Sequence, residues 1–167
     1  MIKEGTVARR PRNLTALIAI LRDPCRSFAA HDEAVRLLGR MGGQAVEPLI
    51  ALLDDPDSAV RGRAAAALGR IGQAAIKGLR RALADSDPVV RGGVVLALGL
   101  TRHARAVRPL IGALDDPVAE VRRRAAVALG WLGSSYAVEA LTAALQDESE
   151  AVREAAREAL AKIAAGE

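Results

Sequence analysis

The sequence predicts an all-α fold, a right-handed α-α superhelix (a solenoid) of five stacked two-helix units. Three observations lead to this prediction. Residues recur at a fixed spacing, acidic turns separate short amphipathic segments, and the apolar positions are aliphatic, since the chain has only one Phe, one Trp and one Tyr. A period of roughly 20–50 residues is the signature of a repeat array. Alanine and leucine form helices readily, so an aliphatic helical core is expected.

Five columns of residues recur in four consecutive units. An arginine returns at spacings of 30, 31 and 31 residues, a valine precedes it, and a leucine follows seven residues later. An aspartate and a second leucine hold two further columns. The columns are Arg61, Arg91, Arg122 and Arg153; Val60, Val90, Val121 and Val152; Leu68, Leu98, Leu129 and Leu160; Asp55, Asp85, Asp116 and Asp147; and Leu49, Leu79, Leu110 and Leu141.

The first unit is expected over about residues 13–43, after a flexible basic N-terminal arm formed by residues 1–12. Asn13 is a good N-cap for a helix over 14–22. Asp23-Pro24 ends that helix, because proline cannot continue one and disfavours helix in the residue before it.

A second helix is expected from about 30 to 40, and Gly42-Gly43 ends it. His31 stands where Arg61 stands in the next unit. Terminal units of solenoids are commonly atypical in this way.

Four regular units follow, at about 45–73, 75–103, 106–134 and 137–165, so that 13–165 forms a single repeat domain. Each begins with a short helix A, predicted over 46–53, 76–84, 107–114 and 138–146. Its apolar residues recur at i, i+3, i+4 and i+7, the period of a one-sided helix. An acidic turn then precedes helix B, where capping and the helix dipole favour carboxylates. Gly72 and Gly133 are placed to end helix B in a left-handed cap.

Net charge, cysteine count and the length of apolar runs limit the classes of protein to which the chain can belong. The net charge of +4 comes from residues 1–44, which hold eight Lys/Arg against four acids, so this end could bind an anion or be a solvated cap. Cys25 is the single cysteine, which excludes an internal disulfide and favours a reducing compartment. No apolar run reaches the roughly 18 residues of a membrane span, and no signal-peptide core is evident. A soluble cytoplasmic protein without a membrane partner is expected.

The repeated pattern resembles HEAT repeats, most closely the short bacterial and archaeal form called PBS-lyase HEAT-like, or E-Z type, repeats. The resemblance covers about residues 13–165 and implies an α-solenoid of armadillo type. The matching motifs are Val46-Glu-Pro-Leu-Ile-Ala-Leu-Leu, Val60-Arg61, Ala65-Ala66-Ala67-Leu68-Gly69, Val107-Arg-Pro-Leu-Ile, Val121-Arg122 and Ala128-Leu129-Gly130. By resemblance, the functions include adaptors and chromophore-attaching proteins, and fold alone does not choose between them.

The aspartate and arginine columns are predicted to be structural. An acid ahead of helix B and an arginine in its first turn should form a ladder of charge-assisted hydrogen bonds between neighbouring units. No catalytic residue, metal site or cofactor is predicted, because His31 and His103 lie far apart in sequence and Cys25 has no partner at metal-ligand spacing. A Cys25–His31 nucleophile pair is conceivable but lacks an orienting group.

The variable face of helix B is the predicted binding surface. Positions one, five and nine after the repeated arginine share one stripe, the helix-B face, which we expect to line the concave side of the stack. This face reads as basic at one end, apolar in the middle and acid-rich at the other. Gly92-Gly93 opens space beside the apolar part. The predicted partner-binding residues are Arg36, Arg40, Arg70, Leu96, Leu100, Arg123, Val127 and Trp131.

Exposed apolar patches usually mark interaction sites, and Trp and Arg are enriched at binding hot spots. Alternatively, Trp131 packs on its neighbouring repeat, or under Tyr136, as core. The leading hypothesis is a non-enzymatic scaffold or adaptor that binds a protein or peptide segment. The alternative, by resemblance, is a phycobilin-lyase-like chromophore-attachment subunit or chaperone. Nucleic-acid binding through the basic N-terminal end is less favoured, and self-association is a further option.

Overall fold

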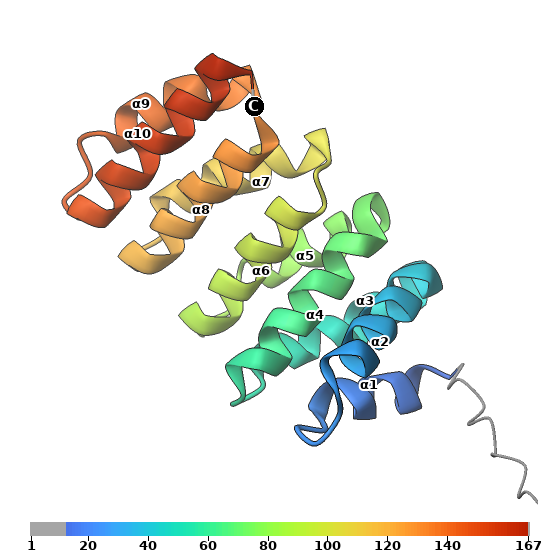
Figure 1. The fold of residues 1–167 in the computed structure, drawn as a ribbon. Helices are drawn as coiled ribbons and strands as arrows, with labels where there is room; N and C mark the ends of the chain where they lie inside the picture. Colours follow the sequence, from blue (N-terminus) through green and yellow to red (C-terminus); the bar gives the residue numbers. More distant parts are fainter. Residues whose placement is uncertain (1–12, 167) are drawn as a thin grey trace, which may run out of the picture.

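A computed structural model describes residues 13–166 of the chain, and these residues form an all-α solenoid of stacked helix pairs (Figure 1). The predicted fold class is confirmed. The predicted basic arm, residues 1–12, lies outside the described residues. Within the described range, no helix is long and apolar enough to cross a membrane.

Two layers of helices run along the stack. Figure 1 shows the longer helices B side by side in front and most of the shorter helices A behind them. The helices A are α1 (Leu14–Arg22), α3 (Val46–Ala51), α5 (Ile76–Ala82), α7 (Val107–Gly112) and α9 (Val138–Ala144). The helices B are α2 (Phe28–Met41), α4 (Ser58–Ile71), α6 (Pro88–Leu100), α8 (Ala119–Leu132) and α10 (Glu150–Ala165). Short 3-10 turns join them: η1 (Gly42–Ala45), η2 (Leu52–Asp54), η3 (Gly72–Ala75), η4 (Ala104–Ala106), η5 (Ala113–Asp115) and η6 (Ser135–Ala137).

Several helix ends differ from the predicted ones. Helices α3, α5, α7 and α9 each end two residues earlier than predicted, at Ala51, Ala82, Gly112 and Ala144. Helix α2 begins at Phe28 rather than 30, because Ser27 is its N-cap and accepts a hydrogen bond from the Ala30 N–H at 3.3 Å. Gly133 ends α8 in the predicted left-handed conformation, with φ 61° and ψ 21°. Gly72 has φ 68° but ψ −132°, so it leads into η3 instead of forming a left-handed cap.

The core is aliphatic and continuous along the stack. The largest fully buried side chains are leucines, with Val60 beside them, and the two leucine columns supply seven of them. Leu160, in α10, is only half-buried, because no further unit packs on this helix within the described residues. The fully buried leucines are Leu17, Leu21, Leu38, Leu49, Leu53, Leu68, Leu79, Leu98, Leu110, Leu129 and Leu141.

A column of glycines sets how closely neighbouring helices B approach. Gly69, Gly99 and Gly130 each follow a leucine of the helix-B column, and Gly39 follows Leu38 at the corresponding place in the first unit. A Cβ added at Gly69 would lie 2.5 Å from Leu100 Cβ, and one at Gly99 would lie 2.8 Å from Ala128 Cβ. At Gly39 and Gly130 the nearest atoms, Arg70 Cβ and Ala159 Cα, would be 2.7 and 3.0 Å away. Side-chain carbons do not come this close, so the helices meet only because these positions carry no side chain.

Each arginine of the repeated column binds its own turn. In all four regular units Nη1 donates to the carbonyl oxygens of the residues six and five positions earlier. In the first unit His31 takes this place, and its Nε2 donates to the Asp23 carbonyl at 3.0 Å. The turn before helix B is therefore held by the first residues of helix B itself.

Contacts between units use the Nε and Nη2 atoms of the guanidinium group. Arg91 donates to both carboxylate oxygens of Asp116 at 2.7 and 2.9 Å. Arg122 does the same to Asp147 at 2.8 and 2.9 Å. Bidentate charged pairs are the strong members of their class, and the four side chains are almost fully buried.

The first two junctions depart from the predicted ladder. His31 has no guanidinium with which to reach the next unit, and Arg22 of α1 instead donates to Asp55 at 3.0 Å. At the next junction Arg61 donates to its own turn, and in the described range it makes no ion pair with Asp85. Asp85 stays exposed, and its carboxylate accepts the Asp87 N–H.

Replacing Gly69 by alanine should destabilise the protein by about 1–3 kcal/mol, because the new methyl group overpacks the contact with Leu100. Gly62 in the same helix is the matched control, since no neighbouring element lies within 4 Å of its added Cβ. Gly62→Ala should stabilise by about 0.5–1 kcal/mol through helix propensity. Urea unfolding followed by circular dichroism measures both. Stabilisation by both substitutions would contradict the close approach.

Asp116→Asn should cost about 1–3 kcal/mol of unfolding free energy, because buried Arg91 loses its charged partner. Asp85→Asn, in the same column but without that partner, should change it by less than about 0.5 kcal/mol. The hydrogen bond from Arg91 lowers the pKa of Asp116. The stabilisation is therefore complete above the unfolded-state pKa and is lost as pH falls through the folded-state pKa. Equal effects of the two substitutions, measured in urea, would contradict this assignment.

Candidate functional site

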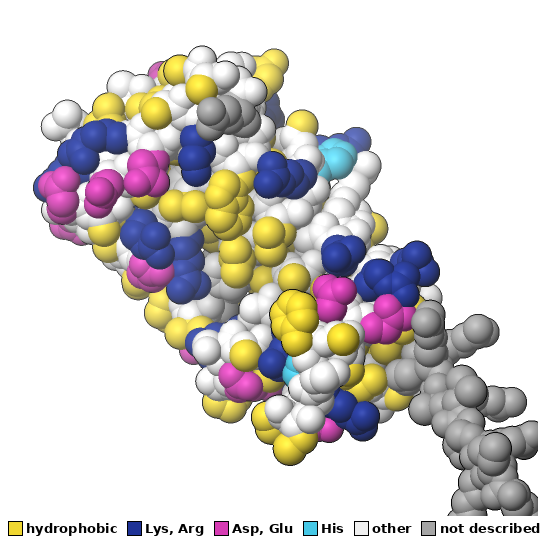
Figure 2. Space-filling model, viewed as in Figure 1, with side chains coloured by type: hydrophobic (Ala, Val, Ile, Leu, Met, Phe, Trp, Pro, Cys, Tyr) yellow, Lys and Arg dark blue, Asp and Glu magenta, His cyan; other side chains and the backbone are white. Residues whose placement is uncertain are grey.

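A pocket of about 260 Å³ opens on the helix-B face between α6 and α8. Figure 2 shows apolar side chains gathered over these two helices, with Lys and Arg side chains around them. Four of the five lining residues are predicted partner-binding residues. The lining consists of Leu96, Arg123, Arg124, Val127 and Trp131.

The helix period brings the apolar walls together. Val127 and Trp131 lie one turn apart on α8, and Leu96 faces them from α6. The Trp131 ring lies over Gly99, where a Cβ would be 3.1 Å from its Cε3 atom. Trp131 is half-buried, so it packs on the neighbouring unit and lines the pocket as well. Trp131 thus packs partly as core, and its role in binding a partner stays a prediction.

Leu100 lies outside the pocket lining. It is 37% exposed and packs its Cβ against the α4 glycine at position 69. It therefore extends the apolar surface of the helix-B face beyond the pocket, toward α4.

The basic wall is a cluster of Arg123, Arg124 and Glu120 on α8. Arg123 donates to both carboxylate oxygens of Glu120 at 2.8 and 2.9 Å, and Arg124 donates to the same carboxylate at 2.7 Å. These contacts, with that from Arg123 largest, lower the pKa of Glu120 to about 2, and Glu120 raises the pKa of Arg123. The cluster carries a net charge of +1, and both guanidinium groups are held at the pocket edge.

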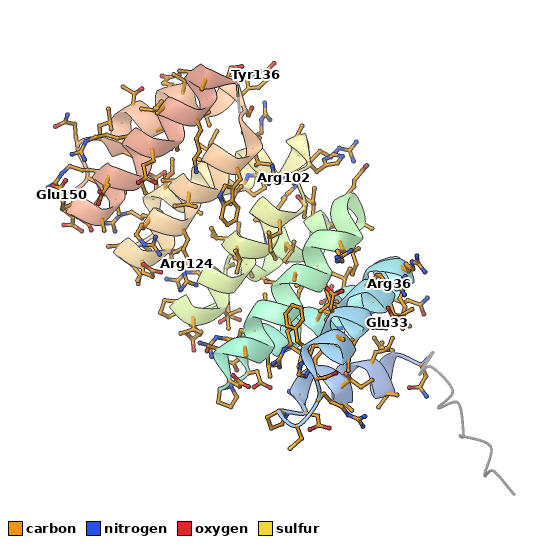
Figure 3. All side chains as sticks on the ribbon, in the orientation of Figure 1. Glu33, Arg36, Arg102, Arg124, Tyr136 and Glu150 are labelled. Atoms are coloured by element: carbon orange, nitrogen blue, oxygen red, sulfur yellow. The ribbon has the colours of Figure 1, made fainter. Side chains whose placement is uncertain are left out.

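Arg124 reaches across to the neighbouring helix. Its Nη1 lies where a Cβ of Gly92 would approach it to 2.8 Å, so the glycine of α6 leaves room for the guanidinium (Figure 3). Arg124 was not among the predicted binding residues. Gly92, predicted to open space beside the apolar patch, was the signal that could have located it.

Arg102 is a second residue absent from the predicted set. It follows α6, adopts φ 49°, and its Nη1 donates to the Trp131 carbonyl at 3.3 Å. Figure 3 shows it beside the end of α6, toward α8. A left-handed conformation at a non-glycine residue is uncommon. At Arg102 it occurs together with the hydrogen bond to the Trp131 carbonyl of α8. Nothing in the local sequence indicates this contact.

The remaining predicted residues lie along the face, away from the pocket. Arg36 of α2 forms a salt bridge with Glu33 (Figure 3). Arg40 and Arg70 are exposed, on α2 and α4. At the opposite end, Glu154 and Glu158 of α10 are exposed. The order along the face is thus basic, apolar and acidic.

The described residues contain no group of three or more His, Cys, Asp or Glu side chains that could hold a metal ion. Cys25 is exposed, whereas His31 is buried with Nε2 bound to a backbone carbonyl. The His31 ring thus holds the turn before α2, and in the described range no hydrogen bond joins it to the Cys25 thiol.

The carboxyl group of Glu120 should titrate with a pKa of about 2 in the folded protein. Its stabilising contribution should be complete above the unfolded-state pKa and should disappear as pH falls through about 2. Side-chain carboxyl NMR measures the value directly, with glutamate in the urea-unfolded chain as the reference. A pKa for Glu120 equal to that reference would show that the arginines are not held as described.

Comparisons with known proteins identify the family. The family model for HEAT repeats matches residues 14–93 and 76–161. No curated protein matches the chain. Among solved structures, the complex of CpcE and CpcF of phycocyanin lyase from Nostoc sp. PCC7120 is similar with a TM-score of 0.61 and 24% identity, covering 87% of this chain and 96% of that one.

Human deoxyhypusine hydroxylase in complex with glycerol is similar with a TM-score of 0.56 and 22% identity, covering 91% of this chain and 74% of that one. A designed armadillo repeat protein in complex with the peptide (KR)4 gives a TM-score of 0.53 and 22% identity, covering 90% and 81%. At these identities the likeness shows the fold alone. The family-model match extends over nearly the whole described range, and the chain belongs to the HEAT-repeat family.

Proposed function

We propose that this protein is a non-enzymatic scaffold that binds a segment of another protein on its helix-B face, in the cytoplasm. The observation that carries the proposal is the pocket between α6 and α8. Trp131 and two aliphatic side chains form its apolar walls, and two arginines form its edge. Trp and Arg are the residues most enriched at binding hot spots.

The size of the pocket favours a side chain over a cofactor. Its volume of about 260 Å³ lies below the roughly 300–1,000 Å³ of small-molecule sites. One bulky apolar side chain of a partner fills such a space. A tetrapyrrole does not, which counts against chromophore attachment at this pocket, the function class of the similar phycocyanin lyase complex.

The charge around the pocket defines the partner further. The cluster of Arg123, Arg124 and Glu120 has a net positive charge, and Arg40 and Arg70 extend it toward α2. Exposed Glu154 and Glu158 lie beyond the pocket on α10. A segment with an apolar anchor, acidic residues toward α2 and a basic residue toward α10 would complement the face. The fold itself supports peptide binding, since a similar designed armadillo protein is in complex with a peptide.

Selection from a random peptide library, displayed on phage, tests the proposal. Selected peptides should carry a bulky apolar residue next to an acidic one. Their affinity, measured by fluorescence anisotropy, should fall by about 30-fold in Trp131→Ala, the loss of a hot-spot side chain worth on the order of 2 kcal/mol. Val127→Lys, which places a charge in the pocket, should weaken binding similarly.

Phe28→Ala is the matched control, because Phe28 is an exposed aromatic residue outside this pocket. It should leave the affinity for those peptides unchanged. Circular dichroism establishes that each variant is folded. The proposal is wrong if no peptide is selected, if the selected peptides bind the Trp131 and Val127 variants normally, or if bilin alone binds with a spectral shift that Trp131→Ala abolishes.

A further inference from the structure

A second, larger groove lies outside the helix-B face. It has a volume of about 1260 Å³ and lies along α5 and α7, with η4 and the turn before α9 at its edge. Its floor is aliphatic: Ile76 and Val107 are buried, and Leu83 and Ile111 are half-buried. None of the five residues that line the first pocket contributes to it.

Four cations line this groove, and no carboxylate does. Lys77 and Arg80 belong to α5, Arg105 to η4 and Arg108 to α7, and all four are exposed. Within the described part of the chain none of them forms an ion pair or a side-chain hydrogen bond. Arg81, next to Arg80 but outside the groove, does pair with a carboxylate, that of Glu47. Four uncompensated like charges raise the local positive potential.

The repeat framework does not require these cations. The position of Lys77 and Arg108 is occupied by Glu47 and Glu139 in the flanking units. Arg80 corresponds to isoleucine or threonine in the other units, and Arg105 to glutamine, alanine or tyrosine. The arginine column that holds the turns, in contrast, is present in every regular unit. The cations therefore distinguish the middle of the stack from its ends.

Tyr136 stands at one end of the groove. It is 87% exposed, the most exposed large apolar side chain in the described range, and Figure 3 shows it at the edge of the stack. Its ring offers apolar contact area and its hydroxyl a hydrogen bond, the combination that favours tyrosine at interfaces.

From this arrangement we propose that the groove binds an acidic protein segment that also carries aliphatic side chains. The carboxylates face the four cations, and the aliphatic side chains lie on the floor. Neighbouring packed helices are about 8–10 Å apart, so the groove spans roughly 20 Å over three units, or about six residues of extended chain. An aliphatic floor with a single aromatic side chain suits a peptide better than nucleic acid, whose bases need stacking platforms.

The test uses a fluorescein-labelled peptide of about 12 residues in which glutamate pairs alternate with single leucines, and anisotropy as the readout. Arg105→Gln with Arg108→Gln should weaken binding by about tenfold or more, the loss of two charged surface contacts. Both variants are made in the Trp131→Ala background, which removes the anchor of the first pocket, so that binding at the helix-B face contributes little. Arg26→Gln with Arg157→Gln is the matched control, because it removes the same charge from exposed positions outside both pockets. The control should change the affinity less than about twofold.

The same peptide with glutamine for glutamate should bind at least about tenfold more weakly, and adding Tyr136→Ala to Trp131→Ala should weaken binding of the acidic peptide. Four results would overturn the proposal: no saturable binding of the acidic peptide, equal affinity for the glutamine peptide, equal losses in the two arginine pairs, or tighter binding of an oligothymidylate of similar length. The last would identify a nucleic-acid site instead.

Discussion

The stack depends on the close approach of neighbouring helices B at one column of glycines. Because Gly39, Gly69, Gly99 and Gly130 have no side chain, the next helix packs directly on their backbone. This approach closes the layer of leucines beneath it, so that an almost purely aliphatic core excludes water without large aromatic side chains. It also brings the turn of one unit within reach of the arginine of another, as at Arg91 and Asp116.

The same constraint shapes the helix-B face, which we propose as the binding surface. The residue after each column glycine lies on the helix-B face and is free to vary, and it reads Arg40, Arg70, Leu100 and Trp131. At the α6–α8 junction the indole packs over Gly99 while the Arg124 guanidinium lies over Gly92. Two glycines of one helix thus receive two side chains of the next, and the pocket is the space between them. The recurring residues hold the frame, whereas the function that we propose depends on the variable ones.

Much of this could be predicted from the sequence, because the frame repeats. The period, the leucine columns and the turn aspartates located the helices to within a few residues, and the outer stripe of helix B brought together most of the pocket lining. Contacts that occur between only one pair of neighbouring units could not be predicted, because no repeated residue marks them. The left-handed Arg102 depends on its tertiary contact with α8, and Arg61 stays within its own turn although its column matches Arg91. The basic groove was missed because its cations come from different positions of two units and are hidden in a nearly balanced total charge.

The most direct test of this account is the fluorescence of Trp131, the single tryptophan of the chain, in the folded Gly99→Ala variant. A methyl group at position 99 would lie 3.1 Å from the indole and should push the ring toward solvent. We predict a shift of its emission to longer wavelength and stronger quenching by acrylamide, with Gly69→Ala, which overpacks a junction without tryptophan, leaving both unchanged. Identical spectra for the two variants would contradict the claim that the glycine column positions the walls of the pocket.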